Sequence, residues 1–282
     1  MDQAITIPLE DELGDVLEKA MSCAGLDEEQ LATRSGVAAS RIRDAVDYRP
    51  ELTSGELRRL AAVLGLNEVG LCALGSGMYP VPEIGPLPFC VLPLRMPHGI
   101  GVVNAYVVSE ALLDRCLLFD TGPGLDSLTA AWPSGIRAID CVFLTHVEGE
   151  HAGGLCDVVR HFGVSAALVP AGSEAPCGRP MGEGEIRQFG SLEVTAFSTP
   201  GHSAQHNCYL VRSTNVRAGR ALLVAGDLVF LGSAGGPYFC HRQLRTHLRR
   251  VLSAVPPDTV VAPGHGPLTT AGNEIRFNPF LV

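Results

Sequence analysis

The chain has 282 residues, of which 46% are hydrophobic and 18% are charged, and its formal net charge is −9 at pH 7. This length suffices for one large domain, or for a large and a small one, and the composition is typical of a globular protein. The negative charge argues against broad electrostatic attraction to nucleic acid or to anionic membranes. The acidic start, Met1 to Glu12, lacks the apolar core of a signal peptide, and the apolar stretch 221–230 is short and contains Asp227. We therefore expect a cytoplasmic protein that does not span a membrane.

Nine cysteines are scattered along the chain without a C-x-x-C pair. An odd, unclustered set is not typical of a disulfide framework or of a zinc knuckle. We expect reduced thiols, most of them packed among apolar residues, where a free cysteine behaves as a small hydrophobic residue.

Residues 1–75 are predicted to form a small all-helical domain. Apolar residues recur at helical spacing over 9–24, two short helices with a turn at Gly36 follow over 27–46, and a further helix begins at Thr53 or Ser54 and stops at Gly65. This order resembles the helix-turn-helix of the phage-repressor family, over residues 10–75.

The charge of this domain argues against a role in DNA binding. Residues 1–75 contain fourteen acidic and seven basic residues, a difference of −7, whereas contacts to phosphate supply most non-specific affinity for DNA. In the phage-repressor family the start of the second motif helix contacts the bases, and here it supplies Ala39, Ser40, Arg41 and Arg43. Only the two arginines could read guanine well. We favour a role in packing, in a homodimer contact or as a wall of the active site, and operator binding stays the alternative.

Residues 76–88 are rich in proline and glycine and predict a linker, and residues 89–282 predict a second, larger domain. Short apolar runs interleave with segments of helical spacing, which favours two sheets flanked by helices. The expected strands are 90–94, 101–108, 112–119, 138–145, 166–170, 192–197, 207–211, 221–228 and 259–262, and the expected helices are 124–131, 155–162 and 241–254.

Four side chains that can bind a metal ion lie within six residues, at His146, Glu148, Glu150 and His151. They follow a predicted buried strand, and two glycines after them allow a helix to begin at close range. Because alternate residues of an extended chain point the same way, we expect the first three to converge on one side, with the fourth closing from the next position. A strand, a ligand-rich loop and a helix together predict a metal site.

This spacing resembles the first metal motif of the metallo-β-lactamase superfamily, T-H-x-H-x-D-H-x-G-G. Glu148 stands in place of the second histidine of that motif, and Glu150 in place of its aspartate. Later motifs of the superfamily are matched in order by 199–203, 226–227 and 263–266, and its opening strands by 103–108 and 118–122. The resemblance implies the α/β class and an αββα sandwich.

Carried over residue by residue, the resemblance implies two metal ions, with His146, Glu148 and His202 on one, Glu150, His151 and His265 on the other, and Asp227 bridging them. In such a pair, with ions about 3.5 Å apart, a bridging hydroxide forms near neutral pH and is the nucleophile. Asp227 and Glu150 are therefore also the expected catalytic residues. The two glutamates could instead mark a decayed site, but the five ligand positions that keep the superfamily's residues argue against decay.

Glu148 raises the number of carboxylates in the expected site from two to three. Harder oxygen ligands and added negative charge favour iron or manganese over zinc. The flavodiiron branch of the superfamily has a similar H-x-E-x-D pattern with iron. We therefore expect two irons, with zinc or manganese as the alternatives.

The tail that follows His265, over 263–281, is similar to the ending of glyoxalase II-type hydrolases, in which a Thr, a Glu and an Asn-Pro follow the last metal histidine. The resemblance implies hydrolysis of a thioester. A thiolate leaving group, with a conjugate acid of pKa near ~8.5, needs little protonation, and no obvious general acid accompanies the ligands. We expect an acyl-thioester hydrolase that acts on acyl-CoA or a similar carrier.

Three further residues are candidate substrate contacts, namely His206, Arg245 and Arg249. Arginine clusters bind phosphate or carboxylate bidentately, but a packed histidine and a solvated helix face are the alternatives. Two other functions stay open: a di-iron oxygenase or sulfur dioxygenase, and a DNA-binding regulator whose metal domain senses a ligand.

Overall fold

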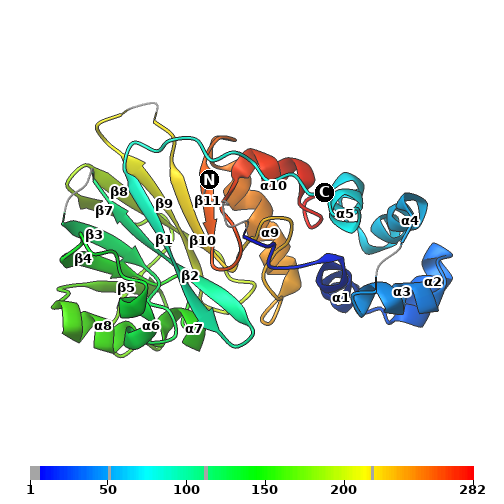
Figure 1. The fold of residues 1–282 in the computed structure, drawn as a ribbon, viewed down its shortest axis with the longest axis horizontal. Helices are drawn as coiled ribbons and strands as arrows, with labels where there is room; N and C mark the ends of the chain where they lie inside the picture. The colour runs from blue at the N-terminus through cyan, green and yellow to red at the C-terminus, as the bar shows by residue number, and fades with distance from the viewer. Residues whose placement is uncertain (1–6, 50–51, 111–113, 217–218) are drawn as a thin grey trace, which may run out of the picture.

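Two six-stranded sheets pack face to face in the computed structural model, which describes residues 7–49, 52–110, 114–216 and 219–282. Figure 1 shows helices α6, α7 and α8 beside the first sheet and α9 and α10 beside the second. The prediction of an α/β fold with an αββα sandwich is confirmed. In the described residues, no helix is both long enough and apolar enough to cross a membrane.

The first sheet has the order β1-β2-β3-β4-β5-β6, antiparallel from β1 to β3 and parallel from β3 to β6. In the parallel pair β3–β4, Phe119 lies opposite Phe143, so both strands end at the same edge of the sheet. The loop that carries the metal motif begins at this edge. The elements of this half are β1 (Cys90–His98), β2 (Gly101–Ser109), β3 (Arg115–Phe119), α6 (Leu125–Ala130), β4 (Ala138–Phe143), α7 (Gly149–Ala152), α8 (Leu155–Phe162), β5 (Ala167–Pro170) and β6 (Arg179–Met181).

The second sheet has the order β12-β11-β10-β9-β8-β7, in which only β10 and β11 run parallel. Asp227 follows the end of β10 and His265 follows the end of β11, so these two ligands meet at one edge. The elements are β7 (Ile186–Phe189), β8 (Leu192–Ser198), β9 (Asn207–Ser213), β10 (Leu222–Gly226), α9 (His241–Ser253), β11 (Val260–Pro263), β12 (Thr269–Thr270) and α10 (Ala271–Phe277).

Aromatic side chains fill the space between the two sheets. The ring of Phe119 stacks on that of Phe143 with centroids 4.9 Å apart, and Tyr209 of the second sheet meets the Phe143 ring at 5.2 Å. The Tyr209 hydroxyl donates a hydrogen bond to the Leu144 carbonyl oxygen across the sandwich. Burial of these large apolar surfaces, each worth about 1.5–3 kcal/mol, fixes the two sheets against each other directly beneath the metal motif.

Five helices form a lobe at one end of the molecule, next to α9 and α10 (Figure 1). Glycines in the left-handed region end three of them, and Thr53 and Glu56 form a capping box at the start of the fourth. The helices are α1 (Leu13–Ala24), α2 (Glu28–Ser35), α3 (Ala39–Val46), α4 (Ser54–Leu64) and α5 (Glu68–Gly75).

The helical lobe is packed on the sandwich through a shared apolar core. Val16 and Leu17 of α1 belong to the same buried cluster as Leu244 and Leu248 of α9. The Lys19 ammonium donates a hydrogen bond to the Ala234 carbonyl oxygen at 2.9 Å, which ties α1 to the loop after β10. The lobe is thus held against the second sheet and its helices. The exact boundaries 1–75, 76–88 and 89–282 stay a prediction.

The prediction that the cysteines are all reduced is wrong for one pair. Cys156, in the first turn of α8, and Cys177, in the loop between β5 and β6, form a disulfide with Cα atoms 5.6 Å apart. The other seven cysteines are free. The pair escaped the sequence analysis because the two residues are 21 positions apart and meet only when β5 runs back alongside α8.

Several short elements were not predicted, namely α5, α7, β6, β7, β12 and α10. Four of these six have at most four residues, too few to show a hydrophobic period. The strand expected over 112–119 is observed from Arg115, and its first two residues lie outside the described part of the chain, as do the first six residues of the acidic start.

Candidate metal centre

Seven side chains from four loops converge at one edge of the sandwich. They form two groups, and within each group the ligand atoms lie within 4.8 Å of one another. The loops are those that follow β4, β8, β10 and β11, and each starts at a strand end that the two sheets bring to the same edge. The first group contains His146, Glu148 and His202, and the second contains Glu150, His151, Asp227 and His265.

The expectation that Glu148 and Glu150 point to one side is wrong. The chain is extended at Glu148, but a short helical turn, α7, begins at Gly149. The turn rotates Glu150 and His151 away from the direction of Glu148, because successive helical residues are about 100° apart rather than 180°. The motif therefore supplies ligands to two separate groups, which are the two sets that the superfamily resemblance implied.

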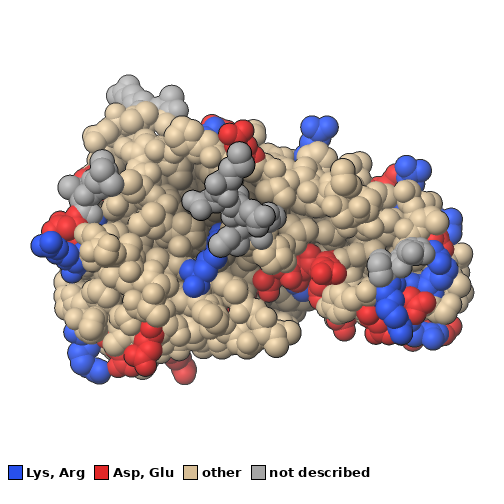
Figure 2. Space-filling view, in the orientation of Figure 1, with Lys and Arg blue, Asp and Glu red and all other residues tan. Residues whose placement is uncertain are grey.

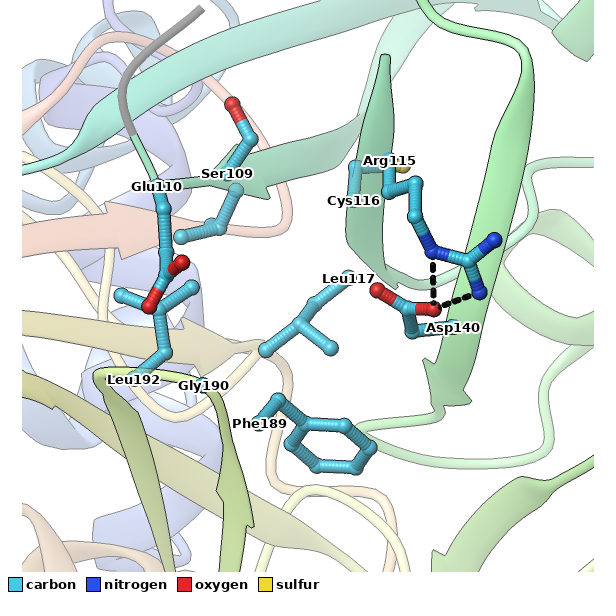
Figure 3. A pocket seen from close by; sticks show the side chains of 10 residues that line it. Ser109, Glu110, Arg115, Cys116, Leu117, Asp140, Phe189, Gly190 and Leu192 are labelled. Atoms are coloured by element: carbon cyan, nitrogen blue, oxygen red, sulfur yellow. Dashed lines mark hydrogen bonds and ion pairs between the residues drawn. The ribbon is translucent and has the colours of Figure 1, made fainter. Parts of the chain in front are cut away.

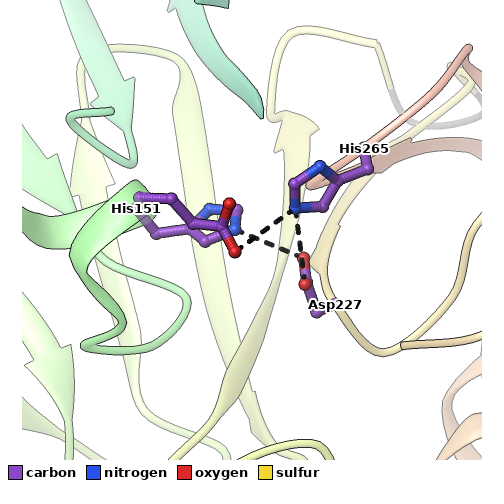
Figure 4. Close-up of side chains that lie close together, drawn as sticks. His151, Asp227 and His265 are labelled. Carbon is purple, nitrogen blue, oxygen red and sulfur yellow. Dashed lines mark ion pairs between the residues drawn. The ribbon is translucent and has the colours of Figure 1, made fainter. Parts of the chain in front are cut away.

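Asp227 stands between the two groups. Its Oδ1 lies 3.4 Å from His151 Nε2, and its Oδ2 lies 3.5 Å from His202 Nε2 and 3.6 Å from His265 Nε2. Figure 4 shows His151, on the short helix α7, and His265, in the loop after β11, directed at this carboxylate from two sides of the site. Asp227 is therefore placed to bridge two ions, one in each group.

The Nδ1 atoms of four of the histidines are held by neighbours, so that each Nε2 points into the site. His202 Nδ1 lies 2.8 Å from the Gly236 carbonyl oxygen and His265 Nδ1 lies 3.0 Å from that of Val102. His151 Nδ1 lies 3.2 Å from Asp120 Oδ2, and His146 Nδ1 lies 2.9 Å from Thr145 Oγ1. Such hydrogen bonds fix the ring and the tautomer of a metal-binding histidine.

The buried atoms that face one another lack hydrogen-bond partners, which fits a metal centre. The Nε2 atoms of His146, His151 and His202 and Oδ1 of Asp227 are buried and have no hydrogen-bond partner among the described residues. A buried polar atom without a partner costs about 1–3 kcal/mol, and four of them at one point would be strongly unfavourable without a ligand. The donor set of nitrogen and carboxylate oxygen suits a divalent or trivalent transition-metal ion.

Asp120 and Thr145 support the ligands from behind and were not singled out from the sequence. The Asp120 carboxylate accepts hydrogen bonds from the Thr145 backbone N–H at 2.7 Å and from its hydroxyl, and also faces His151. Asp120 has a φ of +61°, a left-handed conformation that costs about 1 kcal/mol or more for a residue with a Cβ. The signal that could have found it is its place at the end of β3, next to the end of β4.

The pKa values of the candidate ligands are shifted by burial and by one another. Burial would raise the pKa of Asp227, but His151, His265 and His202 outweigh burial and lower it. Burial would lower the pKa of His151, but Asp227 and Asp120 raise it to about 9. Burial, with the other histidines, holds the pKa of His146 well below its usual range. The buried carboxylate therefore stays ionised and attracts either protons or a cation to the surrounding nitrogens.

Two glycines let the backbone approach the ligands closely. A Cβ on Gly264 would lie 2.1 Å from Asp227 Oδ1, and a Cβ on Gly226 would lie 2.6 Å from Thr145 Oγ1. Gly226 also has a φ of +49°, which favours glycine. A side chain at either position would displace Asp227 or the support behind His146.

The metal centre forms the floor of a cleft of about 640 Å³. Its other wall comes from the helical lobe, through the segment before α1 and α1 itself, which supply Glu10, Asp11, Asp15, Glu18, Lys19 and Ser22. Figure 2 shows acidic side chains gathered at the junction between the lobe and the sandwich. The helical lobe therefore serves as a wall of the candidate active site.

The three residues suggested as substrate contacts lie elsewhere. His206 is 1% exposed, and burial lowers its pKa to about 3; it lies 2.7 Å from Thr199 Oγ1 and accepts a hydrogen bond from the Asp227 backbone N–H. Arg245 donates to the Gly65 carbonyl oxygen at 2.9 Å, and Arg249 donates to that of Val282 at 2.6 Å. His206 thus supports a ligand, and the arginines join α9 to the helical lobe and to the chain end.

A second pocket, of about 390 Å³, opens at the other end of the sandwich, near the start of β3 and β4 (Figure 3). Its charged side chains are already engaged, since Arg115 pairs with Asp140 and Glu110 accepts a hydrogen bond from the Ser191 backbone N–H. None of the seven metal-site residues lines this pocket. We therefore place the candidate active site at the metal centre and not in this pocket.

Comparisons with known proteins agree with this geometry. The hydroxyacylglutathione hydrolase of Citrobacter koseri is 27% identical over 152 residues, which cover 54% of this chain and 57% of that protein. The atrochrysone carboxyl ACP thioesterase of Emericella nidulans is 28% identical over 116 residues, covering 40% of this chain and 37% of that protein.

A solved structure described as TTHA1623 in a di-iron-bound form superposes with a TM-score of 0.51 at 29% identity, and the match covers 67% of this chain and all of that one. The family description "Metallo-beta-lactamase superfamily" matches residues 98–265, which include all seven residues of the metal centre. By this match, and by the sandwich and the ligand loops at its edge, the chain belongs to the metallo-beta-lactamase superfamily.

Proposed function

We propose that this protein is a dinuclear metal-dependent hydrolase that cleaves acyl thioesters, with two irons as the favoured metals. One observation carries the proposal: two groups of ligand atoms, joined by the Asp227 carboxylate, face one another with buried unpaired atoms at the floor of an open cleft. In hydrolysis, water adds to the acyl carbon, the carbon–sulfur bond breaks, and the products are a carboxylic acid and a thiol.

Bound there, two metal ions would supply a Lewis acid and a water-derived nucleophile near neutral pH. The chain's own residues do the rest. His146, Glu148 and His202 would hold one ion, and Glu150, His151 and His265 the other, with Asp227 shared between them. The lowered pKa of Asp227 keeps its carboxylate ionised, so that it acts as a ligand rather than as a proton donor.

The preference for iron rests on the three carboxylates of the donor set, Glu148, Glu150 and Asp227. Hard oxygen ligands suit iron or manganese better than zinc, and extra negative charge suits a ferric ion in particular. The similar structure that holds two irons supports the same choice. Zinc and manganese are the alternatives, and metal analysis of the purified protein distinguishes them from iron.

The thioester substrate is supported by the chemistry of the leaving group and by the relatives. A thiolate needs little protonation to depart, which suits a site whose buried polar groups serve as ligands or hold ligands in place. A thioesterase and a hydroxyacylglutathione hydrolase are among the similar proteins. A CoA thioester or a similar carrier is the substrate that the sequence analysis favoured.

The test is metal content, together with thiol release from a panel of acyl thioesters, with and without chelator. We expect about two irons per chain and thiol release that the chelator abolishes. Asp227→Asn should lose both metal and activity, whereas His161→Ala, on the far end of α8, should keep both. Full activity after metal removal, or in Asp227→Asn, would overturn the proposal.

The same experiment separates the other two functions. A di-iron oxygenase would consume dioxygen with its substrate and release no thiol from a thioester. A DNA-binding regulator would shift operator DNA in a salt-dependent way. The two arginines of α3 weigh against this last function, because Arg41 pairs bidentately with Glu56 and Arg43 pairs with Glu29 at 2.6 Å.

A further inference from the structure

The wall that the helical lobe contributes to the cleft carries an excess of negative charge. Of its charged residues, four are acidic, and Lys19 is the one Lys or Arg among the residues that line the cleft. The Lys19 ammonium is bonded to the Asp11 carboxylate and to the Ala234 carbonyl oxygen. The charges of Lys19 and Asp11 therefore cancel, and no Lys or Arg among the residues that line the cleft is left to balance the carboxylates of Glu10, Asp15 and Glu18.

These three carboxylates follow one another from the metal centre outward to solvent. Glu10 Oε1 lies 3.7 Å from Nδ1 of His265, at the inner end. Asp15 is held in place, since it accepts hydrogen bonds from the Glu12 backbone N–H and from the Tyr48 hydroxyl. Glu18 is exposed on α1, and in the described part of the chain no hydrogen bond or ion pair engages its carboxylate. Glu18 is thus available to a ligand.

An exposed aromatic ring lines the same cleft as these carboxylates. Tyr238 lines the same cleft, is 80% exposed, and has its ring centroid 5.2 Å from that of the metal-site residue His202. A large apolar ring left in solvent next to a catalytic centre offers a π-face to a substrate. Carboxylates together with an aromatic face are the groups that recognise ammonium-type cations.

The inner end of the cleft does not share this excess. The three carboxylates among the ligands would be balanced there by two metal ions. The cleft therefore suits a molecule that turns its carbonyl oxygen toward the metal centre and carries a positive charge farther out. An anionic carrier would meet repulsion from Glu10, Asp15 and Glu18, and Arg245 and Arg249, which were its expected partners, bind backbone carbonyls outside the cleft.

We propose, on the basis of the thioesterase function above, that the α1 wall and Tyr238 form a subsite for a cationic group. The preferred substrates are then acyl thioesters that carry an ammonium-type positive charge, and thioesters of polyanionic carriers such as coenzyme A are poor substrates. Glu18 and Tyr238 are the residues that determine this specificity, and α1 supplies the charge to a catalytic centre that belongs to the sandwich.

The test compares matched thioesters with the metal-loaded full chain. An S-acyl thiocholine and the S-(3,3-dimethylbutyl) thioester of the same acid differ only in a charged nitrogen against a neutral carbon. A 3-mercaptopropionate thioester of that acid adds a negative charge instead. We expect kcat/KM to favour the thiocholine ester over its neutral counterpart by roughly tenfold at low ionic strength, and the preference to shrink as salt is added. The anionic ester should be the poorest of the three.

Substitutions locate the effect. Glu18→Lys should bring the preference for the cationic ester over the neutral ester close to unity. Glu28→Lys, which makes the same change of charge on α2 at the far end of the lobe, is the control and should leave the preference intact. Tyr238→Leu should lower the preference several-fold, and Tyr238→Phe should restore it, because the ring rather than the hydroxyl contacts the cation.

Binding keeps the proposal testable without turnover. Thiocholine and 3,3-dimethylbutane-1-thiol should bind the metal-loaded protein with dissociation constants that differ by roughly tenfold in favour of thiocholine, and Glu18→Lys should remove the difference. Equal binding of the two thiols, or an equal or higher rate with the neutral ester, would overturn the cationic subsite even if thioesterase activity is found. Tighter binding of thiocholine without hydrolysis of any thioester would support the subsite and overturn the proposed reaction.

Discussion

The backbone N–H of Asp227 donates a hydrogen bond to Nε2 of His206, and the two atoms are 3.3 Å apart. His206 is therefore a neutral ring with its acceptor turned to Asp227 and its Nδ1–H turned to Thr199 Oγ1, at 2.7 Å. Burial lowers the pKa of His206 to about 3, which keeps this acceptor free of a proton. The residue that looked like a substrate contact thus positions Asp227, the proposed bridging ligand.

The first prediction concerns this support. His206→Ala should weaken metal binding by about 10- to 100-fold, the usual effect of removing a group that orients a ligand, and should cost about 1–3 kcal/mol because the Asp227 N–H loses its partner. Metal titration of the stripped protein measures the first and chemical denaturation the second. His161→Ala is the control, and equal metal affinity in the two variants would contradict the positioning role.

The second prediction concerns the identity of the metal. Glu148→His restores the residue that the superfamily usually has and lowers the number of carboxylates from three to two, so the metal bound from an equimolar mixture of iron and zinc should shift toward zinc. Glu150→Asp also restores the usual residue but keeps all three carboxylates. It should leave the metal preference close to that of the unaltered chain. If both variants shift toward zinc by the same amount, the number of carboxylates does not determine which metal is bound.

The sequence predicted the sandwich and the residues that meet in two groups at its edge, because those features depend on local order. Their role as metal ligands stays a prediction. A buried strand, four ligands within six residues and three later motifs keep their spacing whatever the rest of the chain does. The one error in this region came from Gly149, where the chain turns into a helix that an extended reading does not contain. That turn assigns Glu148 and Glu150 to different groups.

Other features depend on contacts that join distant parts of the chain and leave no local pattern. Lys19 and Ala234 are 215 positions apart, and Cys156 meets Cys177 only through the return of β5. The arginines of α9 fit an anion site by sequence, but the fold directs two of them at backbone carbonyls. Periodicity describes which face of a helix is polar, and it does not say what lies opposite that face.

The third prediction concerns pH and the helical lobe. Glu56 receives two hydrogen bonds from Arg41 and caps α4 with Thr53, and these contacts, Arg41 first, lower its pKa to about 2. A carboxyl with a lowered folded pKa stabilises the fold above its unfolded value near 4.5, and this stabilisation is lost as pH falls toward 2.

Glu56→Gln should therefore destabilise the lobe by about 1–2 kcal/mol at pH 7, by less at pH 3, and by little at pH 2 or below. Far-UV circular dichroism during denaturation at several pH values measures the difference. Glu18→Gln, at an exposed position of α1, controls for loss of a charge in the same lobe. If the stability difference between the unaltered chain and Glu56→Gln stays constant from pH 7 to pH 2, the contribution of Glu56 does not depend on its ionisation.

The last prediction concerns the tail residues that resemble a hydrolase ending. Glu274 is fully buried, and its carboxylate accepts hydrogen bonds from Thr269 Oγ1 at 2.7 Å, Asn278 Nδ2 at 2.8 Å and the Gly232 backbone N–H at 3.1 Å. The network joins α10 to the loop after β10, a few residues beyond Asp227. The tail motif therefore acts by holding the loop next to the site rather than by contacting a substrate.

Glu274→Ala should cost about 3 kcal/mol or more, because it leaves several buried donors without an acceptor, while Glu274→Gln, which keeps one acceptor oxygen, should cost about 1–2 kcal/mol. Glu29→Ala, at an exposed ion pair, should cost less than about 1 kcal/mol.

Burial raises the pKa of Glu274, so its contribution to stability is greatest at low pH and falls as pH rises above 4.5 through the folded-state pKa. The gap between the unaltered chain and Glu274→Gln should therefore narrow from pH 5 to pH 8 in denaturation experiments. A gap that widens over this range would mean that the carboxylate is more stable than the acid in its buried network.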